Sequence, residues 1–539
     1  MIRFGSRGSD LALTQTRTVA EELQRRTGEA FEIEVIETKG DKFLAKPIAE
    51  IGGKGLFTAE LEHALREGRI DVAVHSLKDL PVEDPEGLTI GAIPTREAPH
   101  DVLVFAQDAR DPEGGTVPLL ADRVVGTSSP RRSSSLMSLR PDLHVKDIRG
   151  NVGTRVRKVI EGEYHATILA AAGLSRLGLD TPDLERVALP VETFTPAPGQ
   201  GALGVQCRDE DERVREALST IHDETTTACV LAERNLLFKL GGGCSMPLGA
   251  LVTPASDGDG FRMIASLFSE TRPGCGITLD VHAKESLALP AIAAAKFAPF
   301  LGEPLQGQRI ALLRPGGSGG SLGRALGLAG AEVETVAVSE ILPMHNRTAE
   351  LVAEDLRVIA FTSARAVDRF FEQAAAFGLD LVSPTFFAGG PATAEALRRR
   401  GRECFEPKDN AGGRALSQLI VEKLDPTECA SKVLFPCAES RHGDFETAMQ
   451  DAAFTVEALP VYRTVVLSGV EIPEADHVVF TSPSAVRAYE SGQHAIEPAS
   501  LIALGQTTAD AMASVGMPPH AVAKAPTAKA LVQLIRSLS

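Results

Sequence analysis

The amino-acid sequence predicts an α/β fold, because short apolar runs typical of strands alternate with segments that have helical spacing. Apolar runs lie at residues 31–36, 70–76 and 165–173. Between them apolar residues recur with a helical period, as at Leu61 and Leu65. This order favours parallel-rich sheets with crossover helices, whose ligands bind at strand ends. We therefore expect the functional residues on loops that join a strand to a helix.

Length and composition are those of a globular protein with several domains. The chain has 539 residues, of which 43% are hydrophobic and 24% charged. The start, MIRFGSRGSDLALTQ, lacks a basic segment followed by an apolar one. No run of about 18 apolar residues occurs. We expect a cytoplasmic protein without a membrane segment.

Charge and cysteine content exclude two further classes of protein. The formal net charge of −17 argues against a nucleic-acid partner, because a polyanion would be repelled over much of the surface. Seven cysteines are scattered along the chain and none forms a C-x-x-C motif. This pattern predicts reduced thiols and suggests neither a disulfide framework nor a zinc site, so we expect no bound metal.

The chain divides into two halves near Leu305. Proline and glycine cluster in FAPFLGEPLQGQ, and a new strand is expected from Arg309. Beyond this point VIAFTSARAVDRFFE recurs as HVVFTSPSAVRAYES, and FFAGGPATAEALRRRG recurs as LIALGQTTADAMASVG. The repeat predicts two similar α/β lobes. In both copies Thr-Ser follows a buried strand and is expected to cap the next helix.

Basic residues gather on the predicted loops of the first half. A single exposed arginine is usually an ordinary member of a surface ion pair. Gathered in one place, these cations would instead attract a ligand with many carboxylates or phosphates. Ser9, and Ser128 or Ser129, are expected to cap helices whose N–H groups add further donors. The basic residues are Arg7, Lys54, Lys78, Arg131, Arg132, Arg149, Arg155 and Arg176.

Two single residues stand out by their neighbours. Asp79 follows Lys78 directly after an apolar strand, where partial desolvation would let a carboxylate stabilise a developing cation or exchange a proton. It could equally cap the following turn. Cys244 follows three glycines in KLGGGCSMPLGA. Glycines leave room for a bulky group beside the sulfur, so we expect Cys244 to carry a covalent group.

The motifs of the first half, in their order, resemble those of porphobilinogen deaminase, also called hydroxymethylbilane synthase. They are GSRGSDLAL, GGKGLF, IDVAVHSLKDLP, GTSSPRR, RGNVGTR, ILAAAGLSRLG, PAPGQGALG and GGGCSMPLGA. The resemblance covers roughly residues 1–300. The second half, with VFTSPSAVRAYE, VYRT and ALGQTTADAM, is similar to uroporphyrinogen III synthase.

The resemblance implies a fold for each half. The first, residues 1–304, would have two binding-protein-like lobes and a small α+β domain that bears Cys244. Its first lobe would hold about 1–98 and 194–218, its second about 99–193, and its third domain about 219–304. The second half, residues 305–539, would have one lobe of about 305–345 with 465–539 and another of about 346–464.

For the first half the resemblance implies a transferase. Cys244 would form a thioether to a dipyrromethane cofactor, on which four porphobilinogen molecules condense with loss of ammonia to give hydroxymethylbilane. Asp79 would be catalytic by stabilising the azafulvene cation. Cofactor binding would fall, besides Cys244, to Lys78, Ser129, Arg131, Arg132 and Arg155. Substrate binding would fall to Arg7, Ser9, Lys54, Arg149 and Arg176.

For the second half the resemblance implies a lyase without cofactor or metal. It would close hydroxymethylbilane to uroporphyrinogen III while inverting the last ring. Tyr462 would be catalytic by donating a hydrogen bond to the departing hydroxyl. Substrate carboxylates would bind at Ser363, Thr393, Ser482, Thr507 and Thr508. Each of these five could instead serve only as a helix cap.

Other functions stay open at this point. The second half could be an inactive scaffold beside an active deaminase, since LLRPGGSGG departs from the pattern expected there. The first half could be a nonenzymatic, two-lobed anion-binding protein. Cys244 could be a redox thiol, although no resolving cysteine lies nearby in sequence. The bifunctional reading predicts a monomeric enzyme of tetrapyrrole and haem biosynthesis, with porphobilinogen and hydroxymethylbilane as its small-molecule substrates.

Overall fold

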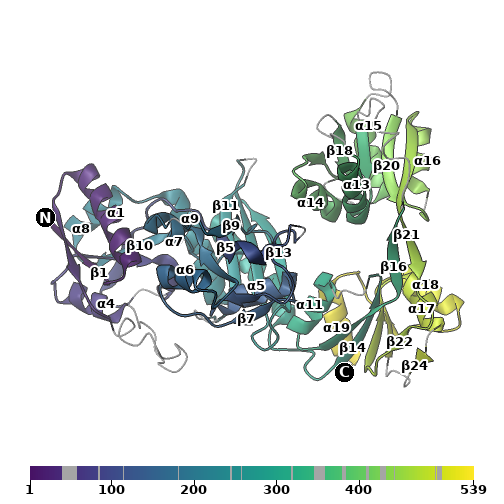
Figure 1. Cartoon of the computed structure of the whole chain (residues 1–539), viewed down its shortest axis with the longest axis horizontal. Coiled ribbons are helices and arrows are strands. Elements are labelled where there is room, and N and C mark those ends of the chain that lie inside the picture. Colours follow the sequence, from purple (N-terminus) through teal and green to yellow (C-terminus); the bar gives the residue numbers. More distant parts are fainter. Residues whose placement is uncertain are drawn as a thin grey trace. The chain divides into compact units, whose positions relative to one another are not determined.

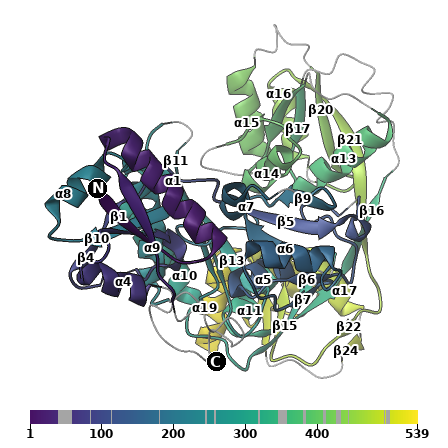
Figure 2. The same cartoon turned by 60° about the vertical axis from the view of Figure 1, so that its left-hand side comes forward.

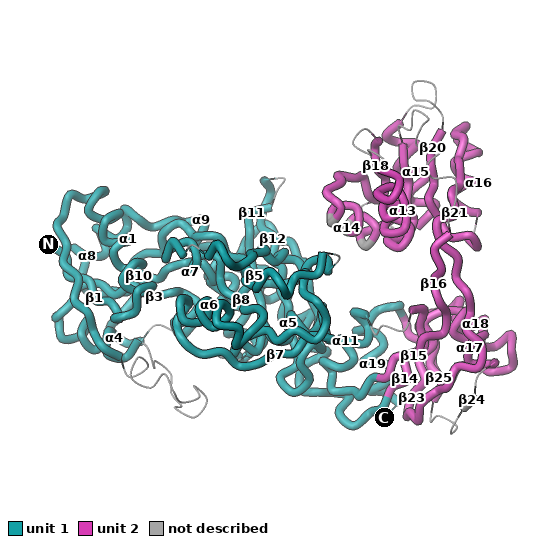
Figure 3. Tube along the Cα trace, viewed as in Figure 1, with its two compact units in different colours: residues 1–309, 320–333, 525–539 teal, residues 310–319, 334–524 magenta. Residues whose placement is uncertain are grey.

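The structure, a computed structural model, has an α/β fold, as the sequence predicts (Figure 1). The chain forms two compact units (Figure 3). Unit 1 contains residues 1–309, 320–333 and 525–539, and unit 2 contains 310–319 and 334–524. The structure describes residues 1–38, 58–82, 85–112, 114–179, 181–242, 246–255, 258–316, 320–344, 358–378, 384–407, 412–424, 432–441, 443–491, 493–494 and 500–538.

The first sheet of unit 1, sheet A, has five strands in the order β2-β1-β3-β10-β4. β1 lies parallel to both β2 and β3, whereas β10 runs antiparallel to β3 and β4. Its strands are β2 (Phe31–Val35), β1 (Ile2–Ser6), β3 (Val72–Ser76), β10 (Leu203–Arg208) and β4 (Leu88–Ala92). Its helices are α1 (Asp10–Thr27), η1 (Leu77–Asp79), α4 (Ala59–Arg66) and α8 (Glu212–Ser219).

Local signals in the sequence set the bounds of α1. Ser9 precedes the helix, and its Oγ accepts a hydrogen bond from Ala12 N. Gly28 ends the helix with a φ of 74°, a left-handed conformation that glycine adopts without strain. One face of α1, with Val19, Ala20 and Leu23, is buried against the apolar side chains of β1 and β3. Figure 2 shows α1 lying across β1. The carboxyl ends of these two strands therefore meet the start of α1.

The second sheet of unit 1, sheet B, has the order β7-β6-β8-β5-β9. β6 is parallel to β7 and β8, and β5 is antiparallel to β8 and β9. Its strands are β7 (His144–Lys146), β6 (Val124–Gly126), β8 (Ala166–Ala170), β5 (Asp101–Ala106) and β9 (Leu184–Ala188). Its helices are η2 (Gln107–Ala109), α5 (Pro130–Leu139), α6 (Val152–Ile160) and α7 (Ala171–Leu177).

A third sheet, sheet C, is an antiparallel meander in the order β11-β12-β13, packed against the long helix α9. Their apolar faces share one core with α10. The strands are β11 (Leu248–Pro254), β12 (Phe261–Phe268) and β13 (Gly276–Ala283). The helices are α9 (Glu224–Lys239), η3 (Ser286–Ala288), α10 (Leu289–Phe297) and η4 (Ala298–Phe300).

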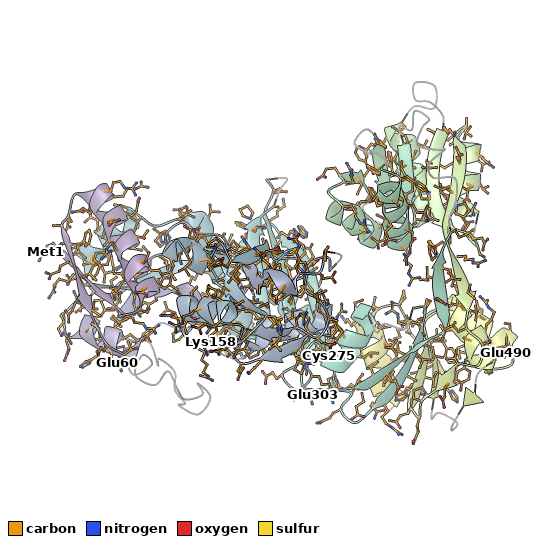
Figure 4. The ribbon with its side chains drawn as sticks, in the orientation of Figure 1. Met1, Glu60, Lys158, Cys275, Glu303 and Glu490 are labelled. Carbon is orange, nitrogen blue, oxygen red and sulfur yellow. The ribbon has the colours of Figure 1, made fainter. Side chains whose placement is uncertain are left out.

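Two helices from later in the chain complete unit 1. They are α11 (Gly320–Leu328) and α19 (Ala528–Leu538), which lie side by side in Figures 1 and 2. α11 contacts β13, and α19 contacts η4. A Cβ added at Gly327 would lie 2.5 Å from Cys275 Sγ, so α11 approaches closely here. Glu303, labelled with Cys275 in Figure 4, accepts a hydrogen bond from Thr271 Oγ1 at 2.8 Å.

Sheet D, most of which belongs to unit 2, has the order β15-β14-β23-β25-β26. β14 begins at Arg309, as the sequence predicts. The strands are β15 (Glu332–Ala337), β14 (Arg309–Arg314), β23 (His477–Phe480), β25 (Ser500–Ala503) and β26 (Ala521–Val522). The helices are α17 (Pro483–Glu490) and α18 (Gln506–Ser514), and β22 (Glu471–Ile472) pairs with β24 (Gln493–His494).

Sheet E of unit 2 has six strands in the order β16-β21-β20-β17-β18-β19. β17, β18, β19, β20 and β21 pair in parallel with one another, while the edge strand β16 is antiparallel to β21. The strands are β16 (Ser339–Pro343), β21 (Thr455–Val466), β20 (Lys432–Ala438), β17 (Val358–Phe361), β18 (Thr385–Ala388) and β19 (Cys404–Phe405). The helices are α13 (Ala364–Ala376), α14 (Pro391–Arg399), α15 (Gly413–Lys423) and α16 (Asp444–Asp451).

Among the residues that the structure describes, no helix combines the length and the hydropathy that crossing a membrane requires.

Candidate active site

The predicted site residues of unit 1 follow strands whose carboxyl ends share an edge. In sheet A, β1 leads to Arg7 and Ser9, and its parallel neighbour β3 leads to Lys78 and Asp79. In sheet B, the parallel strands β6 and β8 lead to α5, with Arg131 and Arg132, and to α7, with Arg176. Strand β5 is antiparallel to β8 and pairs Asp101 with Ala170, so Asp101 begins its strand at this same edge.

The serines of this region behave largely as expected. Ser9 caps α1, and Ser129 caps α5 by accepting a hydrogen bond from Arg132 N at 3.4 Å. Ser128 instead donates to the carbonyl oxygen of Ile148 at 2.9 Å. Of the two serines that could cap α5, the structure thus selects Ser129.

Asp101 is the centre of a buried ion-pair network. Its carboxylate is fully buried and accepts hydrogen bonds from Arg131 Nη1 at 2.8 Å and from Arg132 Nη2 at 2.7 Å and Nε at 3.1 Å. Burial alone would raise the pKa of Asp101, but the two guanidinium groups hold it well below its usual range. Arg131 and Arg132 are themselves buried, so this pairing keeps both charges inside the protein.

Lys78 is connected to this network through Gln200. Lys78 Nζ donates to Gln200 Oε1 at 3.3 Å, and Gln200 Nε2 donates to Asp101 Oδ1 at 3.0 Å and to the carbonyl oxygen of Pro99 at 2.7 Å. The two acceptors of Nε2 fix which side of the amide faces Lys78. Burial and the charge of Arg132 lower the pKa of Lys78 from 10.5 to about 8.

One expectation from the sequence, that the Asp79 carboxylate is partly desolvated, is wrong. The Asp79 side chain is exposed, although it follows the end of its strand. The reason is the 3-10 helix η1, which follows β3 and buries the Leu77 side chain while leaving Asp79 at the surface. The charge of Asp79 raises the pKa of the adjacent Lys78, against the larger effect of burial.

The other predicted cations are partly buried around the same edge. Arg155 Nε donates to the carbonyl oxygen of Gly150 at 2.9 Å, and Arg176 Nη2 donates to that of Gly201 at 2.8 Å. Burial lowers the pKa of both, and the charges of Arg132 and Arg149 lower that of Arg155 further. Arg7 lies close enough to lower the pKa of His75, which burial already depresses to about 4.

Two predicted residues, Lys54 and Cys244, lie outside the described residues. The helix that precedes Cys244 is described: α9 ends at Lys239, and Leu240 follows as its C-cap. An activated thiol has a lowered pKa, and in the described cysteines named next the pKa is raised instead. Burial raises the pKa of Cys207, Cys229 and Cys437 to about 11.

Sequence reasoning missed several residues that organise this site. Asp101 opens an apolar strand, and Gln200 lies inside the motif PAPGQGALG, whose individual residues were assigned no role. Glu233 of α9 is fully buried, and its Oε1 accepts from Arg96 Nη1 at 2.7 Å and its Oε2 from Gly199 N at 2.7 Å. A charged residue within an apolar run was the available signal, because burying a charge demands a partner.

In unit 2 the structure brings together Tyr462 and Ser363. Tyr462 is buried in β21, and its Oη lies 3.4 Å from Ser363 Oγ. Ser363 caps α13 by accepting from Ala366 N at 3.1 Å. Thr393 lies in the first turn of α14, at the carboxyl end of the neighbouring parallel strand β18. Its side chain is buried.

The remaining predicted residues of unit 2 belong to sheet D. Ser482 occupies the N-cap position of α17, but its side chain makes no capping bond, because its Oγ lies 2.8 Å from Ser484 Oγ. Thr508 is buried and Thr507 is exposed in the first turn of α18. The expected capping hydrogen bond is therefore present at Ser363, whereas Ser482 occupies the N-cap position without making that bond.

Described residues include no group of three or more His, Cys, Asp or Glu side chains that could hold a metal ion. The carboxyl ends of the strands of sheets A and B in unit 1 carry a cluster of buried and partly buried cations. Two α/β lobes whose strand ends face such a cluster define a protein that binds a ligand with several anionic groups.

Comparison with known proteins identifies the class. Residues 2–216 match the family model "Porphobilinogen deaminase, dipyromethane cofactor binding domain", and residues 227–273 match "Porphobilinogen deaminase, C-terminal domain". Porphobilinogen deaminase of Listeria monocytogenes is 46% identical over 261 residues, 48% of this chain and 82% of that protein. That of Shouchella clausii is 46% identical over 296 residues, 53% of this chain and 93% of that protein.

The second half matches a different family. Residues 322–533 match the model "Uroporphyrinogen-III synthase HemD". Among solved structures, uroporphyrinogen-III synthetase from Helicobacter pylori is 17% identical, with a TM-score of 0.30, and the match covers 43% of this chain and all of that one. Uroporphyrinogen III synthase from Thermus thermophilus is 19% identical, with a TM-score of 0.24 and the same two coverages. At these scores the structural likeness carries no argument.

The chain belongs to the porphobilinogen deaminase family and carries a uroporphyrinogen III synthase domain after it. It is a bifunctional enzyme of tetrapyrrole biosynthesis with a dipyrromethane cofactor. Its first activity condenses porphobilinogen into hydroxymethylbilane, and its second cyclises that product to uroporphyrinogen III. The resemblance seen in the sequence is confirmed, and neither an inactive second half nor a nonenzymatic anion-binding protein gains support.

Proposed function

We propose that the dipyrromethane cofactor is bound covalently through Cys244 and is held by Lys78, Ser129, Arg131, Arg132 and Arg155. The observation that carries this proposal is a cluster of cations in which one buried donor, Arg131 Nε, has no hydrogen-bond acceptor among the described residues. Burial and then a neighbouring cation lower the pKa of Lys78 and of Arg155. The acetate and propionate groups of pyrroles would supply acceptors for these donors.

The same cluster suggests how roles divide along the substrate. When bound, the cofactor supplies the nucleophilic pyrrole carbon to which porphobilinogen is joined. Asp79 stabilises the cation that develops on porphobilinogen as ammonia departs, which an exposed carboxylate next to the cations can do once substrate covers it. Arg7, Ser9, Lys54, Arg149 and Arg176 bind substrate carboxylates. Fixed donors of this kind exclude water and orient the reacting carbons.

Intact-protein mass spectrometry tests the covalent attachment. Protein purified from a host that makes porphobilinogen should carry the added mass of two condensed pyrrole units. Cys244→Ser should lack that mass, whereas Cys404→Ser, a change at a partly buried thiol of unit 2, should keep it. The proposal fails if Cys244→Ser still carries the dipyrromethane.

For the second activity we propose that Tyr462 is catalytic and that Ser363, Thr393, Ser482, Thr507 and Thr508 bind substrate carboxylates. The pair Tyr462 Oη and Ser363 Oγ, 3.4 Å apart at the carboxyl edge of sheet E, supports this role. A phenol held there can donate a hydrogen bond to the departing hydroxyl. Thr393 and Thr508 occupy matching positions in the two copies of the repeat, each in the first turn of a helix.

Substitution of tyrosines tests the second site. Tyr462→Phe should lower the rate of uroporphyrinogen III formation from hydroxymethylbilane, while the rate of hydroxymethylbilane formation stays unchanged. Tyr489→Phe is the matched control, since Tyr489 is a buried tyrosine of the same unit whose ring packs on Phe480. An equal loss of cyclisation in both variants would contradict a specific role for Tyr462.

The organisation of the chain completes the proposal. We propose that the enzyme acts as a monomer in the cytoplasm, with the lobe and domain bounds expected from the sequence. Gel filtration with light scattering tests the oligomeric state, and a mass near twice 57.0 kDa would refute it.

A further inference from the structure

Arg234 of α9 is a buried cation that the site described above does not use. Its side chain is 4% exposed. Nη1 donates to the carbonyl oxygens of Leu77 at 2.8 Å and of Leu80 at 3.2 Å, and Nη2 donates to that of Pro81. These three carbonyls surround η1, the turn that carries Lys78 and Asp79.

Among the described residues, the turn makes few other hydrogen bonds on its carbonyl side. A 3-10 helix of three residues has few internal hydrogen bonds, and here Leu80 N donates to Leu77 O at a long 3.3 Å. Leu77 N donates to Ala202 O at 3.0 Å, and the buried side chains of Leu77 and Leu80 pack in one core, so the backbone carbonyls are what Arg234 holds in addition. The planar guanidinium can bind several acceptors in a fixed geometry, which an ammonium cannot.

Arg234 also belongs to the segment that leads to Cys244. It precedes Cys244 by ten residues, and α9 ends five residues before Cys244. The adjacent Glu233 binds Arg96 and Gly199 N, which lie on the two segments that join sheet A to sheet B. Successive residues of α9 thus contact the turn after β3 and both connecting segments.

We infer that Arg234 is a positioning residue, which holds the Leu77–Pro81 turn so that Lys78 faces the cofactor and Asp79 faces the substrate. This inference rests on the roles proposed above for those two residues. The Arg234 guanidinium, bound to three carbonyl oxygens, fixes the turn relative to α9. It thereby fixes the turn relative to the segment that follows α9 and leads to Cys244. A shift of the turn by about 1 Å would be enough to lower turnover by roughly a hundredfold.

Hydrogen exchange of the full-length protein tests the positioning independently of activity. Arg234→Lys should make the backbone amides of residues 77–80 and of Val82 exchange faster, while the global melting temperature stays within a few degrees of the wild type. Arg208→Lys is the matched control. Arg208 Nη1 also donates to two carbonyls, those of Leu65 and Ile70, away from the turn. Unchanged exchange at residues 77–80 and Val82 in Arg234→Lys would overturn the inference.

Single-turnover incorporation of porphobilinogen tests the consequence. Arg234→Lys should lower the rate at least about tenfold, and Arg208→Lys should not. In an Asp79→Asn background, Arg234→Lys should lower the rate by a smaller factor than in the wild type, because part of its effect is exerted through Asp79. Additive losses would overturn the inference even if exchange in the turn rises. Full activity of Asp79→Asn would refute the proposed role of Asp79, and the exchange result would then decide by itself whether Arg234 holds the turn.

Discussion

Replacing Asp101 by asparagine removes the negative charge from the buried network of Arg131 and Arg132. The side chain keeps its size, so the change tests charge more than packing. In the wild type the carboxylate accepts from both guanidinium groups and from Gln200 Nε2. An asparagine has one acceptor oxygen, and its NH₂ group would face N–H donors that already point at that place. Two buried cations would lose their counter-charge.

The structure sets the size of the loss. Asp101 is fully buried, and the side chains of Arg131 and Arg132 are only 5% and 8% exposed, so solvent screens little of the interaction. Removing one partner of such a buried pair costs about 3–5 kcal/mol. For domains of about 150–250 residues, each kcal/mol lowers the melting temperature by about 2–4 °C. The loss therefore corresponds to a fall in melting temperature of roughly 6–20 °C.

Calorimetry and urea unfolding measure the effect. Asp280→Asn is the control, because Asp280 pairs with Arg262 at the surface and is 50% exposed, so its loss should cost less than about 1 kcal/mol. Adding Arg131→Met to Asp101→Asn should restore part of the stability, since one uncompensated cation is then removed. A loss below about 1 kcal/mol for Asp101→Asn, or no recovery in the double variant, would refute this account of the network.

Three further outcomes are expected. The pKa of Lys78 is lowered from 10.5 to about 8, so its ammonium is lost in the folded protein over a pH range where the unfolded chain stays protonated. The rate of hydroxymethylbilane formation should therefore fall above about pH 8, because the cofactor is then held less firmly. The free energy of unfolding should increase from there to 10.5, and Lys78→Gln should abolish both trends. Asp79→Asn should lower kcat about a hundredfold with little change in melting temperature, as stopped-flow kinetics and calorimetry would show, because an exposed side chain adds little stability. Leu531→Ala on α19 should destabilise unit 1 by about 2–5 kcal/mol in urea unfolding, since Leu531 is fully buried, whereas Leu538→Ala, 43% exposed, should be nearly neutral.

Much of the fold follows from local sequence. The strand from Arg309, the cap at Ser9 and the cap at Ser363 all agree with the structure. Capping depends on a side chain and a backbone N–H three residues later, so the sequence contains both partners. Ser482 shows the limit of this reasoning, because a nearby Ser484 competes for its hydroxyl.

The candidate site was predictable by residue type but not by environment. The sequence grouped Arg131, Arg132 and Lys78 as cations on loops, without distinguishing them. In the structure Arg131 and Arg132 are buried and paired with Asp101. Lys78 is connected to the same network through Gln200, and Asp79 is exposed. Burial depends on what packs above a residue, and that cannot be seen from its neighbours in sequence.

The sequence by itself determined the α/β class, the strand from Arg309 and the caps at Ser9 and Ser363. Periodicity, caps and turns act within a few residues, so a linear chain displays them. Only the tertiary structure decided which charges meet. Arg131 binds Asp101 across 30 positions, Lys78 binds Gln200 across 122, and Arg234 binds Leu77 O across 157. Such contacts form because strand pairing and helix packing bring the segments together, and no local pattern specifies the partner.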